Sequence, residues 1–92
     1  MKLTEFVLSG CPYCAQAREL IAELRAENPA YDAIELDVID ESVESELADR
    51  YDYYRVPSFF KGEEKLYEAN PLWPRAEVKR RLKAMFDSVL AD

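Results

Sequence analysis

Two kinds of hydrophobic periodicity follow one another along the first part of the chain. Residues 2–8 end in a continuous apolar run, which is typical of a buried strand. Residues 12–27 then show the spacing of an amphipathic helix, and Asn28-Pro29 is expected to end it. The predicted inner face of this helix consists of Ala17, Leu20, Ile21 and Leu24.

Residues 33–38 alternate strictly between apolar and acidic side chains. Such alternation predicts a half-exposed strand, because successive side chains of a strand point to opposite faces. The acidic residues on one face are typical of a strand at the edge of a sheet. The apolar face consists of Ile34, Leu36 and Val38, and the acidic face of Glu35 and Asp37.

A second helix is predicted after this strand. Asp40 is a suitable N-cap, and the acidic residues Glu41 and Glu44 would lie near the positive end of the helix dipole. Pro57 is expected to end the segment. The predicted inner face consists of Val43, Leu47, Tyr51 and Tyr54.

The last third of the chain predicts a hairpin and a helix. Ser58-Phe59-Phe60 is a short strand, residues 61–63 form a turn around a glycine, and residues 64–68 form the return strand. Pro71 and Pro74 precede a helix over residues 74–90, because proline is tolerated in the first turn of a helix. Its predicted inner face consists of Val78, Leu82, Met85 or Phe86, and Val89.

The order strand, helix, strand, helix, hairpin, helix predicts an α/β fold. The first two strands should be parallel and joined by a right-handed crossover, and the hairpin should extend the sheet with antiparallel strands. The expected architecture is a four-stranded mixed sheet with three flanking helices. A length of 92 residues suits one domain over residues 1–92.

The composition narrows the classes of function. The net charge is −7, which argues against a nucleic-acid partner, and the basic cluster of residues 79–83 is interpreted as a solvated helix face. No apolar run reaches the about 20 residues of a membrane helix, so we expect no membrane partner. The N-terminal residues lack the pattern of a signal peptide, and a cytoplasmic location is expected. The chain has no histidine, which excludes histidine-dependent acid–base and nucleophile chemistry.

Two cysteines, Cys11 and Cys14, lie where the first predicted strand gives way to the first predicted helix. Pro12 suits the first helical position. The free N–H groups and the dipole of a helix N-terminus favour a thiolate at Cys11, and the thiolate is the attacking species in disulfide exchange. Cys14 lies one turn further on, so Cys11 is assigned as the nucleophile and Cys14 as the resolving thiol.

A zinc site or a structural disulfide would account for the cysteine pair less well. A structural zinc site takes four ligands, whereas this chain has no third cysteine and no histidine, so we expect no metal. A disulfide that closes so short a loop would add little stability and would not persist in the cytosol. A redox-active dithiol is the interpretation that the position near a strand–helix–strand unit favours.

The residues of this region resemble the dithiol glutaredoxins, within the thioredoxin-like fold. Cys11-Pro12-Tyr13-Cys14 after a first strand is similar to the active-site sequence of that family, and Val56-Pro57 is similar to its second landmark. The resemblance implies a cis proline at Pro57 beside the dithiol. It also implies that the backbone of Val56 receives an incoming peptide or glutathione as an added strand.

The chain also departs from the family pattern. Arg55 stands where the family usually has threonine, which is closer to thioredoxin. Residues 69–74 lack the Gly-Gly-x-Asp turn that holds the amino end of glutathione. Asn70 and the N–H groups at the start of the last helix remain candidates for a carboxylate. Trp73 is expected either to fill the space of that turn or to form a wall of a peptide groove.

These observations predict a thiol–disulfide oxidoreductase that reduces protein disulfides or glutathione mixed disulfides. Cys11 and Cys14 are catalytic, and the predicted substrate-binding residues are Pro12, Tyr13, Arg55, Val56 and Pro57. We expect a monomer with no tightly bound cofactor, with glutathione as co-substrate and a reductase as a further partner. One alternative is a thioredoxin-like protein disulfide reductase that is independent of glutathione. Another is a dimeric module that binds a metal or an iron–sulfur cluster through Cys11.

Overall fold

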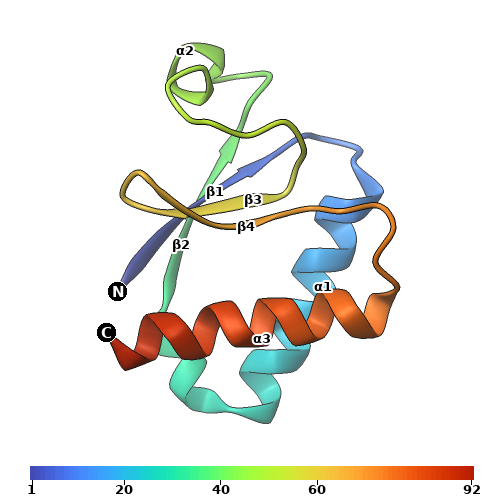
Figure 1. Ribbon diagram of the computed structural model, residues 1–92, viewed down its shortest axis with the longest axis vertical. Helices are drawn as coiled ribbons and strands as arrows, with labels where there is room; N and C mark the ends of the chain where they lie inside the picture. Colours follow the sequence, from blue (N-terminus) through green and yellow to red (C-terminus); the bar gives the residue numbers. More distant parts are fainter.

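One four-stranded mixed sheet runs through the computed structural model, which describes residues 1–92 (Figure 1). The strand order is β2-β1-β3-β4, with β1 parallel to β2 and antiparallel to β3, and β3 antiparallel to β4. The predicted α/β fold class is confirmed. The elements are β1 (Lys2–Val7), α1 (Pro12–Glu27), the 3₁₀ helix η1 (Pro29–Ala33), β2 (Glu35–Asp40), α2 (Ser45–Ala48), β3 (Ser58–Lys61), β4 (Glu64–Glu68) and α3 (Arg75–Ala91).

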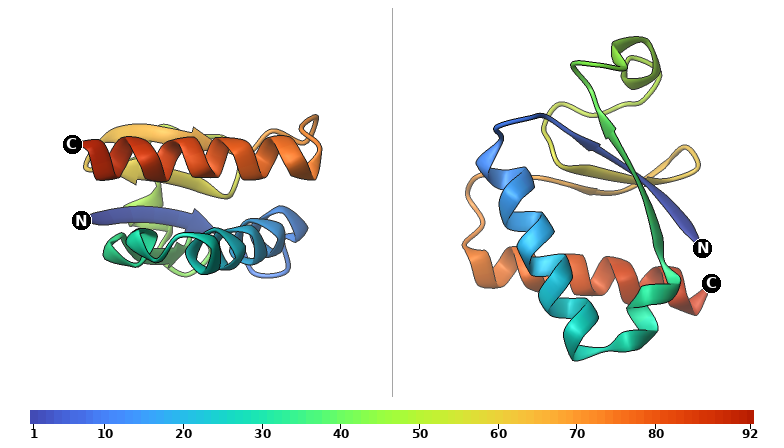
Figure 2. Two further views of the ribbon diagram at one scale, coloured as in Figure 1. Left: turned by 90° about the horizontal axis from the view of Figure 1, so that it is seen from below. Right: turned by 180° about the vertical axis from the view of Figure 1, so that it is seen from behind.

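The two faces of the sheet bury separate apolar clusters. Helices α1 and α3 lie side by side and cover one face (Figure 2), where they enclose the larger cluster around Leu3, Leu20 and Phe59. On the other face, Phe6 and Phe60 lie beneath α2 and the loop after it. Because both faces of the sheet are covered, β1 has apolar side chains that point to either side, such as Leu3 to one face and Phe6 to the other. None of the helices is long and apolar enough to cross a membrane.

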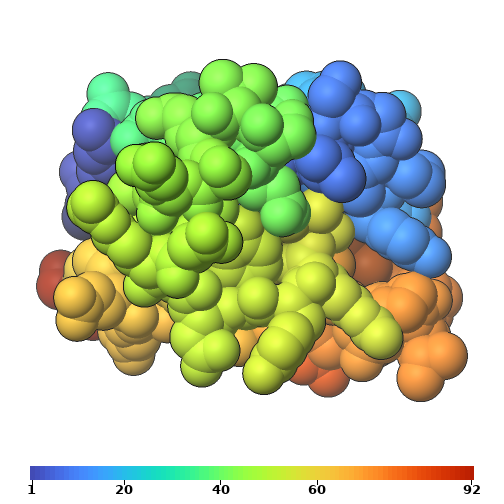
Figure 3. All heavy atoms as spheres, turned by 90° about the horizontal axis from the view of Figure 1, so that it is seen from above, coloured from blue at the N-terminus to red at the C-terminus, as the bar shows by residue number.

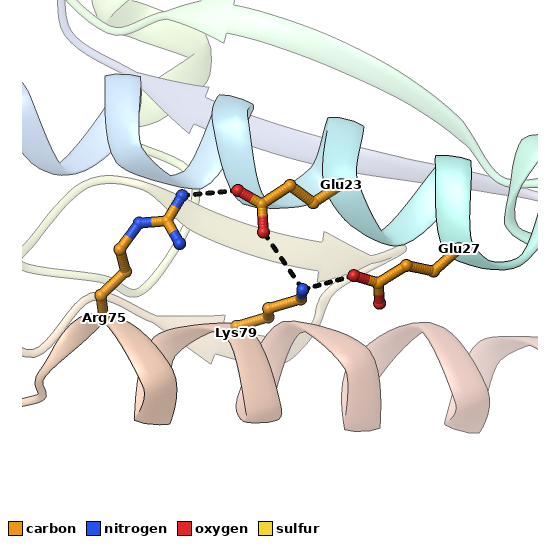
Figure 4. Close-up of polar contacts among 4 residues, drawn as sticks. All are labelled: Glu23, Glu27, Arg75 and Lys79. Atoms are coloured by element: carbon orange, nitrogen blue, oxygen red, sulfur yellow. Dashed lines mark hydrogen bonds and ion pairs between the residues drawn. The ribbon is translucent and has the colours of Figure 1, made fainter.

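An ion-pair network joins α1 to α3 (Figure 4). The Nζ atom of Lys79 lies 3.1 Å from a carboxylate oxygen of Glu23 and 2.6 Å from one of Glu27, and Arg75 Nη2 lies 2.6 Å from the other oxygen of Glu23. The sequence predicts that the basic cluster of residues 79–83 is a solvated helix face. Arg80, Arg81 and Lys83 are exposed as expected, whereas Lys79 is half-buried between the helices.

The prediction for residues 33–38 is wrong in its boundaries and in part of its burial pattern. Asn28 accepts a hydrogen bond from the Ala30 N–H and starts η1, so that β2 begins only at Glu35. Ile34 is buried before the strand begins, and Val38 is 56% exposed because β2 is the edge strand and only one neighbour supports it. Ile39 is buried instead, on the face that α2 covers.

The predicted second helix is reduced to the four residues of α2. Asp40 does not cap it: this residue ends β2, and its carboxylate accepts hydrogen bonds from the N–H and the hydroxyl of Ser42. That local turn competes with helix formation, as short polar side chains commonly do. Val43 and Tyr54 therefore do not belong to an inner face, and they are 79% and 90% exposed.

The last helix agrees with its prediction. Helix α3 covers Arg75–Ala91, and its inner face includes both Met85 and Phe86. The hairpin strands β3 and β4 also lie where the sequence predicts them. Their tight turn is possible because Gly62 adopts a φ of 59°, which side chains disfavour.

Replacing Lys79 with methionine should lower the melting temperature at low salt, because the ion pairs between Lys79 of α3 and the glutamates Glu23 and Glu27 of α1 are lost. The loss should shrink at ~1 M salt, where the Debye length is about 3 Å and partly exposed ion pairs are screened. Lys2→Met is a matched control, since Lys2 makes a single contact of 3.9 Å, to Asp37. Thermal melts at both salt concentrations measure the difference. An equal loss at both concentrations would contradict an electrostatic role for Lys79.

Candidate active site

A tight turn connects the end of β1 to the first cysteine. The Cys11 N–H donates to the carbonyl oxygen of Leu8 at 3.1 Å, and Gly10 has a φ of 80°. A positive φ at the third position of a turn requires glycine or a residue that tolerates it. Pro12 then opens α1 at a position where its missing N–H has no partner to lose.

Cys11 is the N-cap of α1. Its Sγ atom accepts a hydrogen bond from the backbone N–H of Cys14 at 3.4 Å, so the sulfur lies directly over the free N–H groups of the first helical turn. Backbone donors in this position stabilise negative charge on sulfur. Cys11 is partly exposed, Cys14 is buried, and both are free thiols. The prediction that Cys11 is the more accessible of the two is confirmed.

The loop before β3 lies against this helix end. The Val56–Pro57 peptide bond is cis, as the resemblance implied, and the carbonyl oxygen of Val56 lies 3.8 Å from Cys11 Sγ. The Ser58 hydroxyl donates to the carbonyl oxygen of Arg55 at 2.5 Å. The backbone around Val56 is therefore held beside the sulfur by contacts that do not involve the cysteine.

The segments that carry the predicted site residues meet on one side of the molecule. Figure 3 shows the blue segment before α1 and the yellow-green loop before β3 near the orange segment before α3. Tyr13 is 46% exposed beside Cys11, and Pro12 and Arg55 are also exposed. Tyr54 and Leu72, at 90% and 87%, are the most exposed large apolar side chains of the chain.

Sequence reasoning missed a buried carboxyl group beneath the dithiol. Glu5 is 5% exposed in the middle of β1, and it lines a cavity of about 150 Å³ together with Cys14 and Arg18. Burial raises the pKa of Glu5 from its ordinary value of 4.5 to about 7, against the opposing charge of Arg18. A signal was present, because Glu5 lies between Leu3 and Val7 on the same face of the strand.

The second cysteine is a neutral thiol at physiological pH. Burial, and to a smaller extent the nearby Cys11 and Glu5, raise the pKa of Cys14 to about 12, although a backbone hydrogen bond at Leu8 opposes the rise. A thiol is a poor nucleophile until it loses its proton. Cys14 therefore depends on a proton acceptor in order to attack, and Glu5 is the carboxyl group that shares its cavity.

The segment before α3 is closed by its own side chains. Asn70 Oδ1 accepts the backbone N–H of Leu72 at 2.9 Å, so this oxygen is occupied within the turn. The Trp73 ring packs edge-to-face on Tyr67 at 5.8 Å between ring centroids, and the Arg81 guanidinium lies 4.0 Å over it. These contacts place Trp73 between β4 and α3, where it also lines a groove of about 490 Å³, so both roles expected for it stay open.

Comparison with known proteins identifies the family. The sequence model of the glutaredoxin family matches residues 2–65, which is more than half of the chain. The chain belongs to the glutaredoxin family. The match covers both cysteines and Pro57, and it ends before residues 69–74, where the Gly-Gly-x-Asp turn is missing. No curated protein sequence matches the chain.

Among solved structures, the glutaredoxin-family chain is similar to thioredoxin 1 from the thermophilic eubacterium Thermosipho africanus TCF52B. The TM-score is 0.57 at 16% sequence identity, over 97% of this chain and 98% of that chain. At this identity the similarity shows the fold, which is thioredoxin-like. The family and the fold together support a thiol redox function.

Replacing Glu5 with glutamine should stabilise the protein at pH 8 and leave it nearly unchanged below about pH 4.5. A pKa raised to about 7 means that the unfolded chain ionises first, so the free energy of unfolding falls as the pH rises from 4.5 to 7. At ~1.4 kcal/mol per pKa unit, ionised Glu5 costs up to about 3 kcal/mol. Urea unfolding at the two pH values measures the gain, expected at about 1–3 kcal/mol. An unaltered pH dependence in Glu5→Gln would contradict the assignment.

Proposed function

We propose that this protein is a thiol–disulfide oxidoreductase in which Cys11 and Cys14 cycle between a dithiol and a disulfide. The observation that supports this most directly is the position of Cys11. Its sulfur caps the first turn of α1, is partly exposed, and lies 3.8 Å from the Val56 carbonyl oxygen. Cys14 is the third residue of α1, in this same first turn. This arrangement suits attack on an external disulfide followed by internal resolution.

The reaction balances in two exchange steps. The Cys11 thiolate attacks one sulfur of the substrate disulfide; a mixed disulfide forms, and the other substrate sulfur leaves as a thiolate. Cys14 then gives up its proton and attacks Cys11 Sγ, which releases the second substrate thiolate. The substrate gains two electrons, and Cys11 and Cys14 become a disulfide. Two glutathione molecules or a reductase restore the dithiol.

Backbone groups serve the first step. The Cys14 N–H donates to Cys11 Sγ and stabilises the attacking thiolate. The chain at Val56 offers its backbone to an extended substrate, which would pair with it as an added strand. The exposed rings of Tyr13, two residues after Cys11, and of Tyr54, two residues before Val56, would offer apolar contacts to a polypeptide.

Glu5 serves the second step. Its carboxylate is the proposed acceptor of the Cys14 proton, which buried surroundings otherwise hold on the sulfur. A pKa of about 7 is suited to this task, since a general base works best with a pKa near the operating pH. Glu5 would therefore be ionised often enough at neutral pH to accept the proton as Cys14 attacks.

The closed turn before α3 favours a second candidate, a protein disulfide reductase that does not require glutathione. The side-chain oxygen of Asn70 already accepts the Leu72 N–H, so the carboxylate site that the sequence allowed there loses one of its polar groups. A net charge of −7 would also speed encounters with basic partner surfaces. Both candidates share the same dithiol chemistry and differ in what restores it.

Serine variants of the two cysteines test the proposal. Cys11→Ser should abolish turnover of insulin disulfides. Cys14→Ser should accumulate a covalent complex with the substrate, because the mixed disulfide can no longer be resolved internally. Turnover assays and intact mass spectrometry measure both outcomes. Full activity in Cys11→Ser, or no mixed disulfide in Cys14→Ser, would contradict the proposed order of attack.

Glu5→Gln should slow the second step without affecting the first. Resolution of a preformed mixed disulfide on Cys11 should fall about 10-fold or more when the base is removed. In the unmodified protein its rate should rise as the pH passes about 7, and in the variant this rise should move to higher pH. Stopped-flow release of the leaving thiol provides the measurement. Equal rates in the two proteins would exclude Glu5 as the acceptor.

A further inference from the structure

The loop of residues 54–57 is held beside Cys11 by three hydrogen-bonded contacts. Two of them are uncharged: the Ser58 hydroxyl donates to the Arg55 carbonyl oxygen, and the Ala69 N–H donates to that of Pro57 at 3.0 Å. The third is a carboxylate. Glu68, the last residue of β4, lies under the beginning of the loop and binds its N–H groups.

One oxygen of Glu68 binds two successive backbone groups. Its Oε2 accepts the N–H of Tyr54 and that of Arg55, each at 2.8 Å. Its Oε1 accepts a hydrogen bond from Lys65 Nζ, also at 2.8 Å. Burial would raise the pKa of Glu68, but these hydrogen bonds lower it overall and keep the group charged. Charge-assisted hydrogen bonds of this kind are stronger than neutral ones.

An irregularity in β4 makes the arrangement possible. Phe59 pairs with Tyr67, whereas Phe60 pairs with Lys65, so Leu66 is an extra residue in β4. Such a bulge changes the face to which later side chains point. Lys65 lies on the face of Phe60, and Glu68 lies on the face of Ser58, which is the same face. In a regular strand Lys65 and Glu68, three residues apart, would point to opposite sides of the sheet, and the bulge at Leu66 brings them to the same side.

We propose that Glu68 is a positioning residue for the exchange reaction, one that binds the 54–57 loop in the conformation that presents Val56 to a polypeptide substrate. That Glu68 binds the loop is argued from its hydrogen bonds alone. The effect on substrate binding rests in addition on the proposed function. Glu68 acts through the loop and does not contact the sulfur. Cys11 obtains its N–H donor from α1, so the thiol should keep its reactivity when Glu68 is changed.

The test compares three variants. Glu68→Ala removes the acceptor. Glu68→Gln retains an amide oxygen that can accept both N–H groups. Glu64→Ala removes a carboxylate at the other end of β4 and is the matched control, because Glu64 is exposed and forms no side-chain hydrogen bond. Each variant is first checked for an unchanged circular dichroism spectrum and cooperative unfolding.

Hydrogen exchange of the Tyr54 and Arg55 amides is the direct measurement. Exchange should become about 10-fold faster or more in Glu68→Ala. It should stay within about 2-fold of the unmodified protein in Glu68→Gln and Glu64→Ala. Unchanged exchange in Glu68→Ala, or equal acceleration in Glu68→Gln, would overturn the proposal. This result does not depend on any enzymatic activity.

Kinetics with two disulfides test the consequence. KM for a peptide disulfide should rise roughly 3- to 10-fold in Glu68→Ala, as expected for a lost hydrogen-bonded contact, with kcat nearly unchanged, whereas kinetics with the small disulfide hydroxyethyl disulfide should not change. The rate at which iodoacetamide alkylates Cys11 should be unaffected. A parallel fall in alkylation, or an unchanged KM for the peptide, would overturn the positioning role. If the unmodified protein reduces neither disulfide, the proposed function fails, and the exchange measurement still decides whether Glu68 binds the loop.

Discussion

The site depends on two backbone segments that both contact the sulfur of Cys11. The sulfur is bound on one side by the first turn of α1, through the Cys14 N–H at 3.4 Å, and on the other by the Val56 carbonyl oxygen at 3.8 Å. These groups are far apart in the sequence. They meet because β1 and β3 are adjacent in the sheet, so that the end of β1 and the start of β3 lie at the same edge. The position of the dithiol is therefore a property of the whole sheet.

The buried Glu5 lowers the stability of the fold and, in the proposed reaction, takes part in catalysis. A carboxyl group with a pKa of about 7 inside an apolar sheet face weakens the folded state at neutral pH. Cavity-lining neighbours such as Ile21 and Leu36 would accommodate an apolar residue in its place. Proteins commonly accept lower stability at functional sites. Proton transfer from Cys14 therefore best explains why the buried carboxyl group of Glu5 is present despite its cost.

Much of this arrangement could be predicted from the sequence, because the local motifs and the hydrophobic periodicity point to the same elements that the fold contains. The strand–helix junction at Cys11, the cis proline after Val56 and the inner face of α3 all follow from short motifs or clear periodicity. The second helix could not be predicted, because the turn between Asp40 and Ser42 competes with helix formation at the start of the segment. The role of Glu68 was also beyond sequence reasoning, since it depends on the bulge at Leu66.

The central claim is that Cys11 and Cys14 form a reversible redox couple. Equilibration of the purified protein in glutathione buffers of graded ratio, followed by intact mass spectrometry, tests it most directly. The account predicts a single transition between the dithiol and a disulfide that lacks two hydrogen atoms, through a glutathione adduct on Cys11. A midpoint near ~−200 to −230 mV would be that of a typical glutaredoxin. A protein that forms no internal disulfide in these buffers or on incubation with insulin would contradict the dithiol cycle.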